Sequence, residues 1–192
     1  MACLIEQALP CRLPPRRLSP FESLIKSVIY QQLSGKAAGT ILGRFQALFV
    51  REGFPTPRQV ARAPLEKLRS AGLSGAKSRY VQDIARRTLA GRMPTLEECD
   101  GMSDDELIRT LTETKGVGRW TVEMFLIFNL GRSDVLPAHD LGVRKGFQIA
   151  YRKRKMPEPE QLLRFGKRWI PHRTTATWYL WRAADPEFVF AR

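Results

Sequence analysis

The chain has 192 residues, 43 % of them hydrophobic and 27 % charged, which is long enough to bury a core without disulfide bridges. Its three cysteines, Cys3, Cys11 and Cys99, form no Cys-x-x-Cys pair, so a disulfide framework and a cysteine-rich metal site are excluded and a reducing compartment is expected. No stretch approaches the roughly 20 apolar residues of a membrane helix, and the first residues lack the features of a secretory signal.

The charge is strongly positive and unevenly distributed. Lysine and arginine outnumber aspartate and glutamate by 32 to 19, for a net charge of +13. Between Leu141 and Arg182 there are eleven basic residues and only two acidic ones, Glu158 and Glu160. A polyanion is therefore the expected partner, and nucleic acid is favoured over the alternatives of a merely soluble basic surface or an RNA- or ribosome-associated protein.

Helical periodicity runs along most of the chain. Ser-Pro-Phe-Glu at 19–22 is a capping box with proline at the first helical position, and the apolar residues behind it predict a helix that ends near Leu33. Further helices are predicted at 36 to just before 53, 65–69, 77–89, 104–112, 119–130, 140–150, 159–169 and 174–184. Since no alternating strand pattern exceeds four or five residues, the expected fold class is all-α.

A glycine turn separates two of these helices. Gly116, Val117 and Gly118 lie where one helix ends and the next begins, and glycine permits positive φ and close approach of another backbone. The amides of such a turn, at the positive end of a helix dipole, favour a phosphate, and Lys115 and Arg119 flank the turn with charge. On the residues alone, the alternative is a turn that only connects two helices.

Four ordered segments resemble a known family. The first is Gly-Val-Gly-Arg-Trp-Thr at 116–121, preceded by Leu111 and followed by an apolar helix and Val-Leu-Pro-x-x-Asp at 135–140. The others are Ser-Val-Ile-Tyr-Gln-Gln-Leu-Ser-x-Lys-Ala-Ala at 27–38, Gly-Leu-Ser-x-x-Lys-x-Arg-Tyr at 72–80, and Trp-x-Pro-x-Arg at 169–173 with Trp181 behind it. Together they resemble the helix-hairpin-helix (HhH-GPD) DNA glycosylases, in the DNA-3-methyladenine glycosylase II branch.

The resemblance covers roughly residues 20–183 and implies two small helical lobes with the active-site cleft between them. It implies one HhH-GPD glycosylase domain, with a central lobe at roughly 31–115 and a second lobe formed by 1–30 and 116–192. This is the compact form, without the extra N-terminal domain of the bacterial glycosylase II. Residues before Ser19 are expected to wrap the surface or to touch DNA.

The implied activity is base excision repair by a monofunctional glycosylase. Such an enzyme flips out alkylated purines of the 3-methyladenine or 7-methylguanine type and hydrolyses their N-glycosidic bond, leaving an abasic site. A cationic base departs without a general acid, so one carboxylate suffices. The resemblance assigns it to Asp140, which either stabilises the oxocarbenium-like sugar or deprotonates the attacking water. Without the resemblance, Asp140 reads as a helix N-cap, His139 as a solvated or DNA-facing residue and Asp134 as a turn residue.

The same resemblance assigns the base pocket to Trp120, Met124, Leu141 and Trp181. Met124 and Leu141 stand where the bacterial glycosylase II has tyrosines, so this pocket is less aromatic. Bifunctional glycosylase/lyases carry a lysine at the position of Trp120, and since tryptophan cannot form a Schiff base, no lyase activity is expected. Trp169 and Trp178 are expected in the core.

The expected partner is double-stranded DNA with alkylated bases, bound by a monomer with no membrane contact and no obligate protein partner. The expected location is cytoplasm or nucleoid, or the nucleus in a eukaryote. The residues predicted to contact DNA are Gln32, Ser34, Lys77, Lys115, Gly116, Val117, Gly118, Arg119, Thr121, Arg144 and Lys145. Of these, Gln32 is the favoured wedge that fills the gap left by the flipped nucleotide, with a polar helix end as the alternative.

No zinc is expected, and no iron–sulfur cluster, because no cysteine follows Cys99. A monovalent cation held by the carbonyls of the 116–118 turn is the one ion considered. Two other functions stay open: a glycosylase of the same fold for a deaminated or etheno base, and a non-catalytic helix-hairpin-helix module that only binds DNA.

Overall fold

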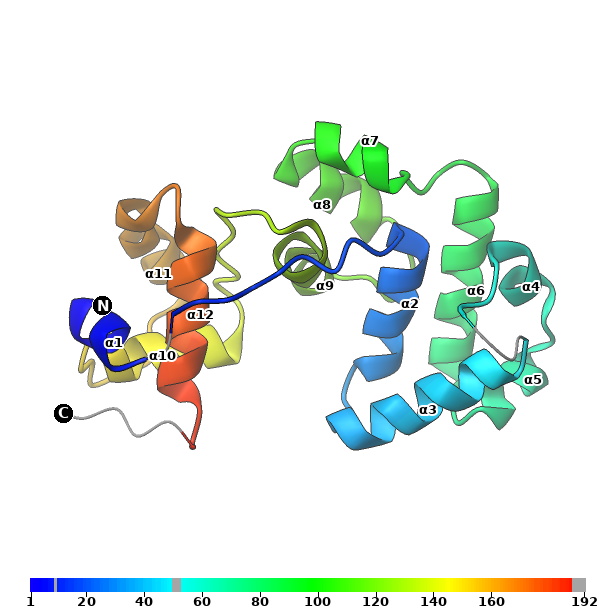
Figure 1. Cartoon of the computed structure of the whole chain (residues 1–192), viewed down its shortest axis with the longest axis horizontal. Coiled ribbons are helices and arrows are strands. Elements are labelled where there is room, and N and C mark those ends of the chain that lie inside the picture. Colours follow the sequence, from blue (N-terminus) through cyan, green and yellow to red (C-terminus); the bar gives the residue numbers. More distant parts are fainter. Residues whose placement is uncertain (9, 50–52, 188–192) are drawn as a thin grey trace. The chain divides into compact units, whose positions relative to one another are not determined.

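The computed structural model describes residues 1–8, 10–49 and 53–187, and within these ranges it contains helices and no strand, which confirms the all-α prediction. Contacts divide the chain into two compact units (Figure 1). The central unit is 17–125, and the terminal unit combines 1–16 with the residues from 126 onward. The sequence places 17–30 and 116–125 in the other lobe, but the helices there pack on the helices of the central unit.

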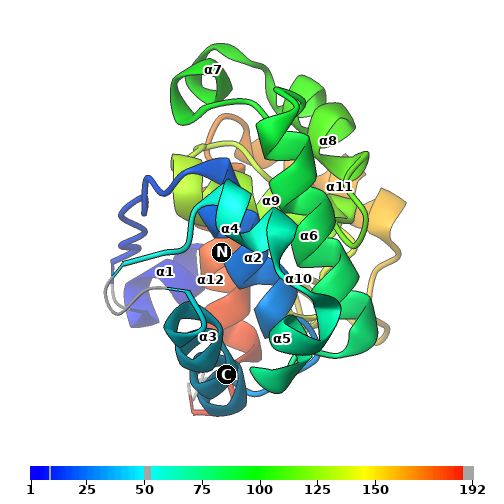
Figure 2. The ribbon, with the colours of Figure 1, turned by 90° about the vertical axis from the view of Figure 1, so that its right-hand side faces the viewer.

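The central unit is built around α6 (Gly75–Leu89). It packs against α2 (Pro20–Tyr30) on one side and against α4 (Pro57–Arg62) and α5 (Leu65–Ser70) on the other, as Figures 1 and 2 show. Helix α3 (Gly35–Ala47) packs on α2, and α7 (Leu96–Gly101) and α8 (Asp104–Thr112) lead to α9 (Arg119–Phe125), which contacts α2 and α8. The apolar faces of α2 and α6 supply fully buried side chains, among them Leu24, Ile25, Val81 and Ile84.

Side-chain caps fix where several of these helices begin. The hydroxyl of Ser19, Ser34, Thr56, Ser74, Thr95 or Ser103 accepts a hydrogen bond from the backbone amide three residues later. Each such cap contributes about 1 kcal/mol of helix stability. At α4, α7 and α8 the side chain of that later residue in turn accepts a hydrogen bond from the backbone amide of the N-cap residue, which completes a capping box.

The terminal unit is centred on α10 (Leu141–Ala150) and α12 (Arg173–Ala184), which pack against each other. Helix α1 (Ala2–Gln7) also packs on α12, and α11 (Pro159–Gly166) runs into the short 3₁₀ turn η2 (Lys167–Trp169). The buried core contains Leu136, Val143, Phe147, Leu162 and Leu180. A π-helical turn, η1 (Leu126–Leu130), continues directly from α9.

A close backbone contact sets the spacing of α10 and α12. A Cβ atom added at Gly146 would overlap the carbonyl oxygen of Leu180, so only glycine fits at this point of α10. Four residues earlier on the same face, a Cβ atom at Gly142 would lie 3.1 Å from the ring of Trp181. The two glycines therefore let α12 approach α10 more closely than side chains would allow.

Several predicted elements need correction. Helices α1, α4 and α7 were not predicted, and the segment before Ser19 begins as a helix that packs in the terminal unit. Helix α3 ends at Ala47, earlier than predicted, and residues 50–52 of the predicted helix lie outside the described residues. Trp169 and Trp178 are only partly buried and pack at the edge of the core.

None of the cysteines Cys3, Cys11 and Cys99 is part of a disulfide bond. Burial raises the pKa of the Cys11 thiol, which favours its protonated, less nucleophilic form. Within the described ranges, no three of the His, Cys, Asp and Glu side chains are grouped as metal ligands would be. Over the same residues, no helix has the length and apolar character to span a bilayer.

Candidate active site

Asp140 is the N-cap of α10, and its carboxylate is held by two donors. Oδ1 accepts a hydrogen bond from the backbone amide of Val143 at 2.8 Å and another from Nε1–H of Trp181 at 2.9 Å. The side chain is half-buried. Capping and a chemical role are therefore compatible in the same residue, because the bonds that cap the helix also fix the orientation of the carboxylate.

The loop that leads to Asp140 is fastened to the start of α12. Asp134 and Arg173 form a bidentate ion pair, with Nε–Oδ1 at 2.7 Å and Nη2–Oδ2 at 2.9 Å. Asp134 Oδ1 also accepts a hydrogen bond from the backbone amide of Arg173 at 3.2 Å. The hydroxyl of Thr174 donates to the carbonyl of Arg132 and accepts the amide of Val135. Asp134 lies in a bend of the loop, as predicted, and it also ties the loop to Arg173, which is 39 residues further along the chain.

The clamp changes the titration of Asp134. The hydrogen bonds from the Arg173 side chain hold the pKa of the Asp134 carboxyl below its usual range, against the opposing effect of burial. The ion pair is only partly exposed, with 30 % and 27 % of the two side chains accessible to solvent. Its geometry therefore depends on Asp134 remaining ionised.

Trp181 is itself supported by a ring that the sequence did not single out. Phe128 stacks on Trp181 with ring centroids 5.7 Å apart and planes inclined by 14°. The guanidinium of Arg16 lies 5.8 Å from the centre of the Phe128 ring, and the Arg16 amide donates to the Phe128 carbonyl at 3.0 Å. Phe128 lies in the π-helical turn, a local widening common near functional sites but without a sequence signal.

The two glycines of the turn differ in the space around them: Gly116 is tightly packed, whereas Gly118 has room for a side chain. Gly116 has φ of +81°, and a Cβ atom there would overlap the ring of Tyr80. Nothing lies within 4 Å of a Cβ atom added at Gly118. Gln31 Nε2 donates to the carbonyl of Gly116 at 3.0 Å, and the amide of Lys115 donates to Asp83. The fold therefore explains Gly116, whereas Gly118 leaves an accessible backbone.

The end of α2 separates the roles of two neighbouring glutamines. Gln31 is the C-cap of α2 and is engaged with the turn at Gly116, whereas Gln32 is exposed and has φ of +56°. The Lys77 ammonium donates to the carbonyls of Ile29 and Gln31 at 2.8 and 2.6 Å. Burial lowers the pKa of Lys77. The Lys77 ammonium therefore caps the end of α2, and its contact with DNA stays a prediction.

Comparison with known proteins decides the family. Residues 25–172 match the model of the HhH-GPD superfamily base excision DNA repair proteins. The chain belongs to the HhH-GPD superfamily. DNA-3-methyladenine glycosylase 1 of Schizosaccharomyces pombe is 43 % identical over 86 % of this chain and 72 % of that protein.

Two solved structures are similar over nearly the whole chain. Schizosaccharomyces pombe 3-methyladenine DNA glycosylase Mag1, in complex with abasic DNA, superposes with a TM-score of 0.84 at 38 % identity over 97 % of this chain and 92 % of the other. DNA-3-methyladenine glycosidase from Bacillus halodurans gives a TM-score of 0.86 at 39 % identity over 95 % and 83 %. The similarity confirms the compact HhH-GPD fold expected from the four sequence segments.

The predicted base-pocket residues of this HhH-GPD chain fall on one helix of the central unit, α9, and on two helices of the terminal unit, α10 and α12. Trp120 and Met124 are four residues apart on α9, hence on one face of that helix, and Trp120 is 47 % exposed. Leu141 follows Asp140 and is 66 % exposed, and Trp181 reaches Asp140 from α12. The terminal unit thus brings Leu141 and Trp181 to the aspartate.

Two residues of the hairpin that are predicted to contact DNA have buried side chains. Val117 and Thr121 are only 4 % and 3 % exposed, so their side chains belong to the core and only their backbone can serve a ligand. Arg119 pairs with the buried Glu123 at 2.9 Å, yet 59 % of its side chain stays exposed. Lys115 and Gly118 are exposed.

Three further predicted contacts have roles within the fold. Ser34 caps α3. Arg144 donates to the carbonyl of Pro157 at 2.8 Å and lies 3.4 Å from a carboxylate oxygen of Glu158, so its guanidinium is engaged within the fold. Lys145 is exposed. The one hydrogen bond described for its ammonium is donated to the side chain of Gln148, at 3.2 Å. Lys145 is therefore the better placed of the two α10 cations for an external anion.

Proposed function

We propose that this protein is a monofunctional DNA glycosylase that removes alkylated purines from double-stranded DNA and leaves an abasic site. The observation that carries the proposal is the half-buried carboxylate of Asp140, oriented by Val143 and Trp181. Membership of a superfamily of base excision repair proteins, and relatives named for 3-methyladenine, support the reaction class and the substrate class.

The chemistry requires little acid catalysis. In a 3- or 7-alkylated purine the base already carries positive charge, so the bond between C1′ and the base nitrogen breaks with its electron pair moving to the base. The sugar becomes oxocarbenium-like, and water then adds at C1′ and loses a proton. Asp140 either stabilises the positive sugar or accepts that proton, and both roles use the ionised carboxylate.

The predicted base-pocket residues are suited to recognise a flipped cationic base. An aromatic ring face attracts a cation by about 0.5–2 kcal/mol, which Trp120 and Trp181 can supply. Met124 adds polarisable surface on the same face of α9 as Trp120, and Leu141 adds aliphatic surface next to Asp140. A damaged base is also easier to extrude, because it is already poorly paired and stacked.

DNA binding is proposed to use backbone amides and exposed cations. The amides beside Gly118, with Lys115, Arg119 and Lys145, would contact phosphates, which gives affinity without sequence preference. Gln32 would enter the duplex, because it is exposed at a turn whose neighbour Gln31 is bonded to Gly116.

No cofactor is needed for these steps. A monovalent cation on the carbonyls of the 116–118 turn stays a prediction. The Gly116 carbonyl already accepts a bond from Gln31, yet a carbonyl oxygen has a second lone pair, so this group is compatible with a cation. Duplex affinity that changes on replacing sodium by potassium at constant ionic strength would support it.

The deciding experiment is release of free base from a methylated duplex by the wild type and by Asp140→Asn. Asparagine caps a helix as well as aspartate does, so the variant should fold. We expect release to fall by at least about a hundredfold, as when one electrostatic stabiliser is removed from an active site. Asp105→Asn makes the same chemical change at an exposed position of α8 and should leave release unchanged.

Treatment with alkali tests the monofunctional assignment. Strands should break only after alkali, because Trp120 offers no amine for a Schiff base. Strand cleavage without alkali would refute that part. If neither protein releases alkylated bases, duplexes with hypoxanthine or ethenoadenine test the other lesions, and tight binding without any release would establish a binding module.

A further inference from the structure

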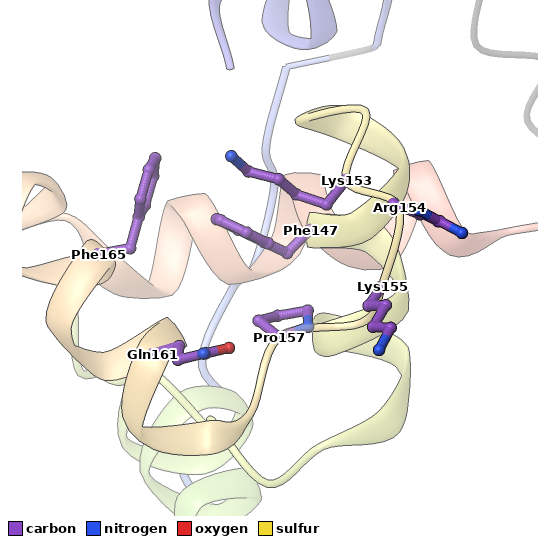
Figure 3. A pocket seen from close by; sticks show the side chains of 7 residues that line it. All are labelled: Phe147, Lys153, Arg154, Lys155, Pro157, Gln161 and Phe165. Atoms are coloured by element: carbon purple, nitrogen blue, oxygen red, sulfur yellow. The ribbon is translucent and has the colours of Figure 1, made fainter.

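A cavity lies in the terminal unit at the C-terminal end of α10. Its volume is about 430 Å³. Figure 3 shows its apolar lining, made by Phe147 of α10, Phe165 of α11 and Pro157 of the connecting loop, with Gln161 and the basic residues 153–155 around it. We name it the basic aromatic cavity. It has the size and lining of a ligand site, with aromatic walls and a few polar groups.

The aromatic lining of the cavity is rigid. Phe147 stacks on Tyr151 at 4.6 Å and meets Phe165 edge-on at 4.8 Å. The guanidinium of Arg168 covers the Phe165 ring at 3.8 Å. Because the rings hold one another, they offer a preformed surface on which an apolar side chain can bind without first ordering the site.

The basic side of the cavity is a concentration of uncompensated charge. Arg152, Lys153, Arg154 and Lys155 are all exposed, and in the part of the chain that the structure describes none of them forms an ion pair. The neighbouring carboxylate of Glu158 is directed to Arg144 instead. Figure 3 shows the side chain of Lys153 extending over Phe147. Four adjacent cations repel one another, and a negatively charged partner relieves that repulsion.

The four basic residues 152–155 also lie in a turn that hydrogen bonds hold in place. Arg152 has φ of +51°, a left-handed backbone conformation that residues other than glycine rarely adopt. The amides of Arg152 and Lys153 donate to the carbonyls of Ile149 and Gln148, and the Gln148 side chain donates to the carbonyl of Arg154. The cations are thus presented by an ordered turn, beside the aromatic walls.

We propose that the basic aromatic cavity docks an acidic segment of a partner protein. One aromatic or large aliphatic side chain of that segment would lie against Phe147 and Phe165. The carboxylates that flank it in sequence would pair with Lys153, Arg154 and Lys155. Such a site goes beyond base excision, since it would recruit another protein to the glycosylase.

Two observations favour a peptide over duplex DNA. A duplex exposes phosphates and sugars, with its bases stacked inside, so it has no apolar group to fill an aromatic hollow. The second observation rests on the proposed function: Asp140 is at the N-terminal end of α10, and the cavity is at the other end of this ten-residue helix, about 15 Å away.

Fluorescence anisotropy with a synthetic probe tests the proposal on the full-length protein. The probe is a fluorescein-labelled heptapeptide of aspartates and glutamates with one central phenylalanine. We expect saturable binding that weakens by at least about tenfold when alanine replaces the phenylalanine, because burying that ring contributes the equivalent free energy. Lys153→Glu combined with Lys155→Glu should weaken binding at least as much.

A matched variant controls for overall charge. Arg58→Glu with Arg62→Glu makes the same change on the exposed side of α4 in the central unit and should leave probe affinity within about twofold. A saturating abasic duplex should also leave probe binding unchanged, and base release by the variant reversed at 153 and 155 should equal that of the wild type. These readouts stay informative even if Asp140 proves not to be catalytic.

Three results would overturn the proposal. Equal affinity for the phenylalanine and alanine probes would mean that only net charge attracts the peptide. Displacement of the probe by duplex, or a loss of duplex affinity in the variant reversed at 153 and 155, would make the cavity part of the DNA surface. No saturable binding by the wild type would mean that no acidic segment docks there.

Discussion

At the scale of single residues, Trp181 joins two parts of the proposed active site: its ring stacks on Phe128 and its indole N–H holds Asp140. Trp181→Phe retains a ring against Phe128 but removes the donor. A hydrogen bond to a charged group contributes about 1.5–3 kcal/mol, so single-turnover base release should fall by at least about tenfold. Loss of the same bond should lower the melting temperature by several degrees, so release is measured well below the onset of melting.

Trp178→Phe is the matched control for that substitution, because it lies three residues earlier on the same helix and contacts Tyr179 and Arg182. Its base release should equal the wild-type value. If both tryptophan variants lost activity equally, the effect would be one of folding and the positioning role of Trp181 would be rejected.

Substitution by alanine should destabilise the fold much more at Gly116 than at Gly118, the two glycines of the hairpin. Gly116→Ala meets the Tyr80 ring at a positive φ, so it should destabilise the fold by at least about 2 kcal/mol in chemical denaturation. Gly118→Ala meets nothing and should cost less than about 1 kcal/mol.

The same two glycine variants separate an effect on folding from an effect on DNA binding. Affinity for an abasic duplex should fall clearly in Gly118→Ala, if a DNA backbone packs against that glycine. Unchanged duplex affinity in Gly118→Ala would remove the turn from the proposed DNA interface, since the fold gives no other reason for a glycine there.

At the scale of elements, the clamp between Asp134 and Arg173 predicts a pH dependence. Asp134 has a lowered pKa in the folded state, so its contribution to stability is fully present above the unfolded-state pKa near 3.8. It is lost as pH falls through the lower folded-state value. Asp134→Asn should therefore be less stable than the wild type at pH 7, and the difference should shrink below about pH 4.

Urea unfolding followed by circular dichroism at pH 7, 5, 4 and 3 measures this difference. Asp105→Asn, at an exposed position, serves as the control and should run parallel to the wild type throughout. A difference between wild type and Asp134→Asn that stays constant down to pH 3 would show that the clamp does not depend on the ionised carboxylate.

Sequence patterns predicted the longer helices because their apolar faces and caps agree. The six-residue helices α4 and α7 are too short for a clear apolar period, although Thr-Pro-Arg-Gln at 56–59 and Thr-Leu-Glu-Glu at 95–98 were capping-box signals that went unused. Helix α1 has no side-chain cap and buries only Leu4. The π-helical turn depends on tertiary packing and leaves no mark in the sequence.

The candidate site divides in the same way. Asp140 and the hairpin could be predicted, because local motifs carry them. The Phe128 ring, the clamp on Asp134 and the engagement of Lys77 and Arg144 could not, since their partners are distant in sequence or chosen by packing. Burial of Thr121 was likewise hidden, because a threonine at the start of a helix reads as exposed.

At the scale of the whole molecule, the net charge of +13 predicts that duplex affinity falls steeply with salt. Each cation that contacts a phosphate contributes about 0.9 to the slope of log K against log salt. Lys115→Gln and Lys145→Gln should each reduce the slope by about that amount. Lys77→Gln should lower the melting temperature and leave the slope unchanged, because the Lys77 ammonium is bonded to the end of α2.

Filter binding or anisotropy between 50 and 300 mM salt gives these slopes. Equal slopes for the wild type and both exposed-lysine variants would exclude Lys115 and Lys145 from phosphate contact. A reduced slope in Lys77→Gln would return that residue to the interface.

The contact of Gly146 with Leu180 has a consequence for heat inactivation. Because main chain rests on main chain there, rotamer exchange cannot alter the separation of α10 and α12, which carry Asp140 and Trp181. Warming can then disturb that pair only by unfolding the unit, so activity should persist up to the onset of melting and vanish with it. The Asp140–Trp181 pair should therefore keep its geometry at every temperature at which the terminal unit is folded.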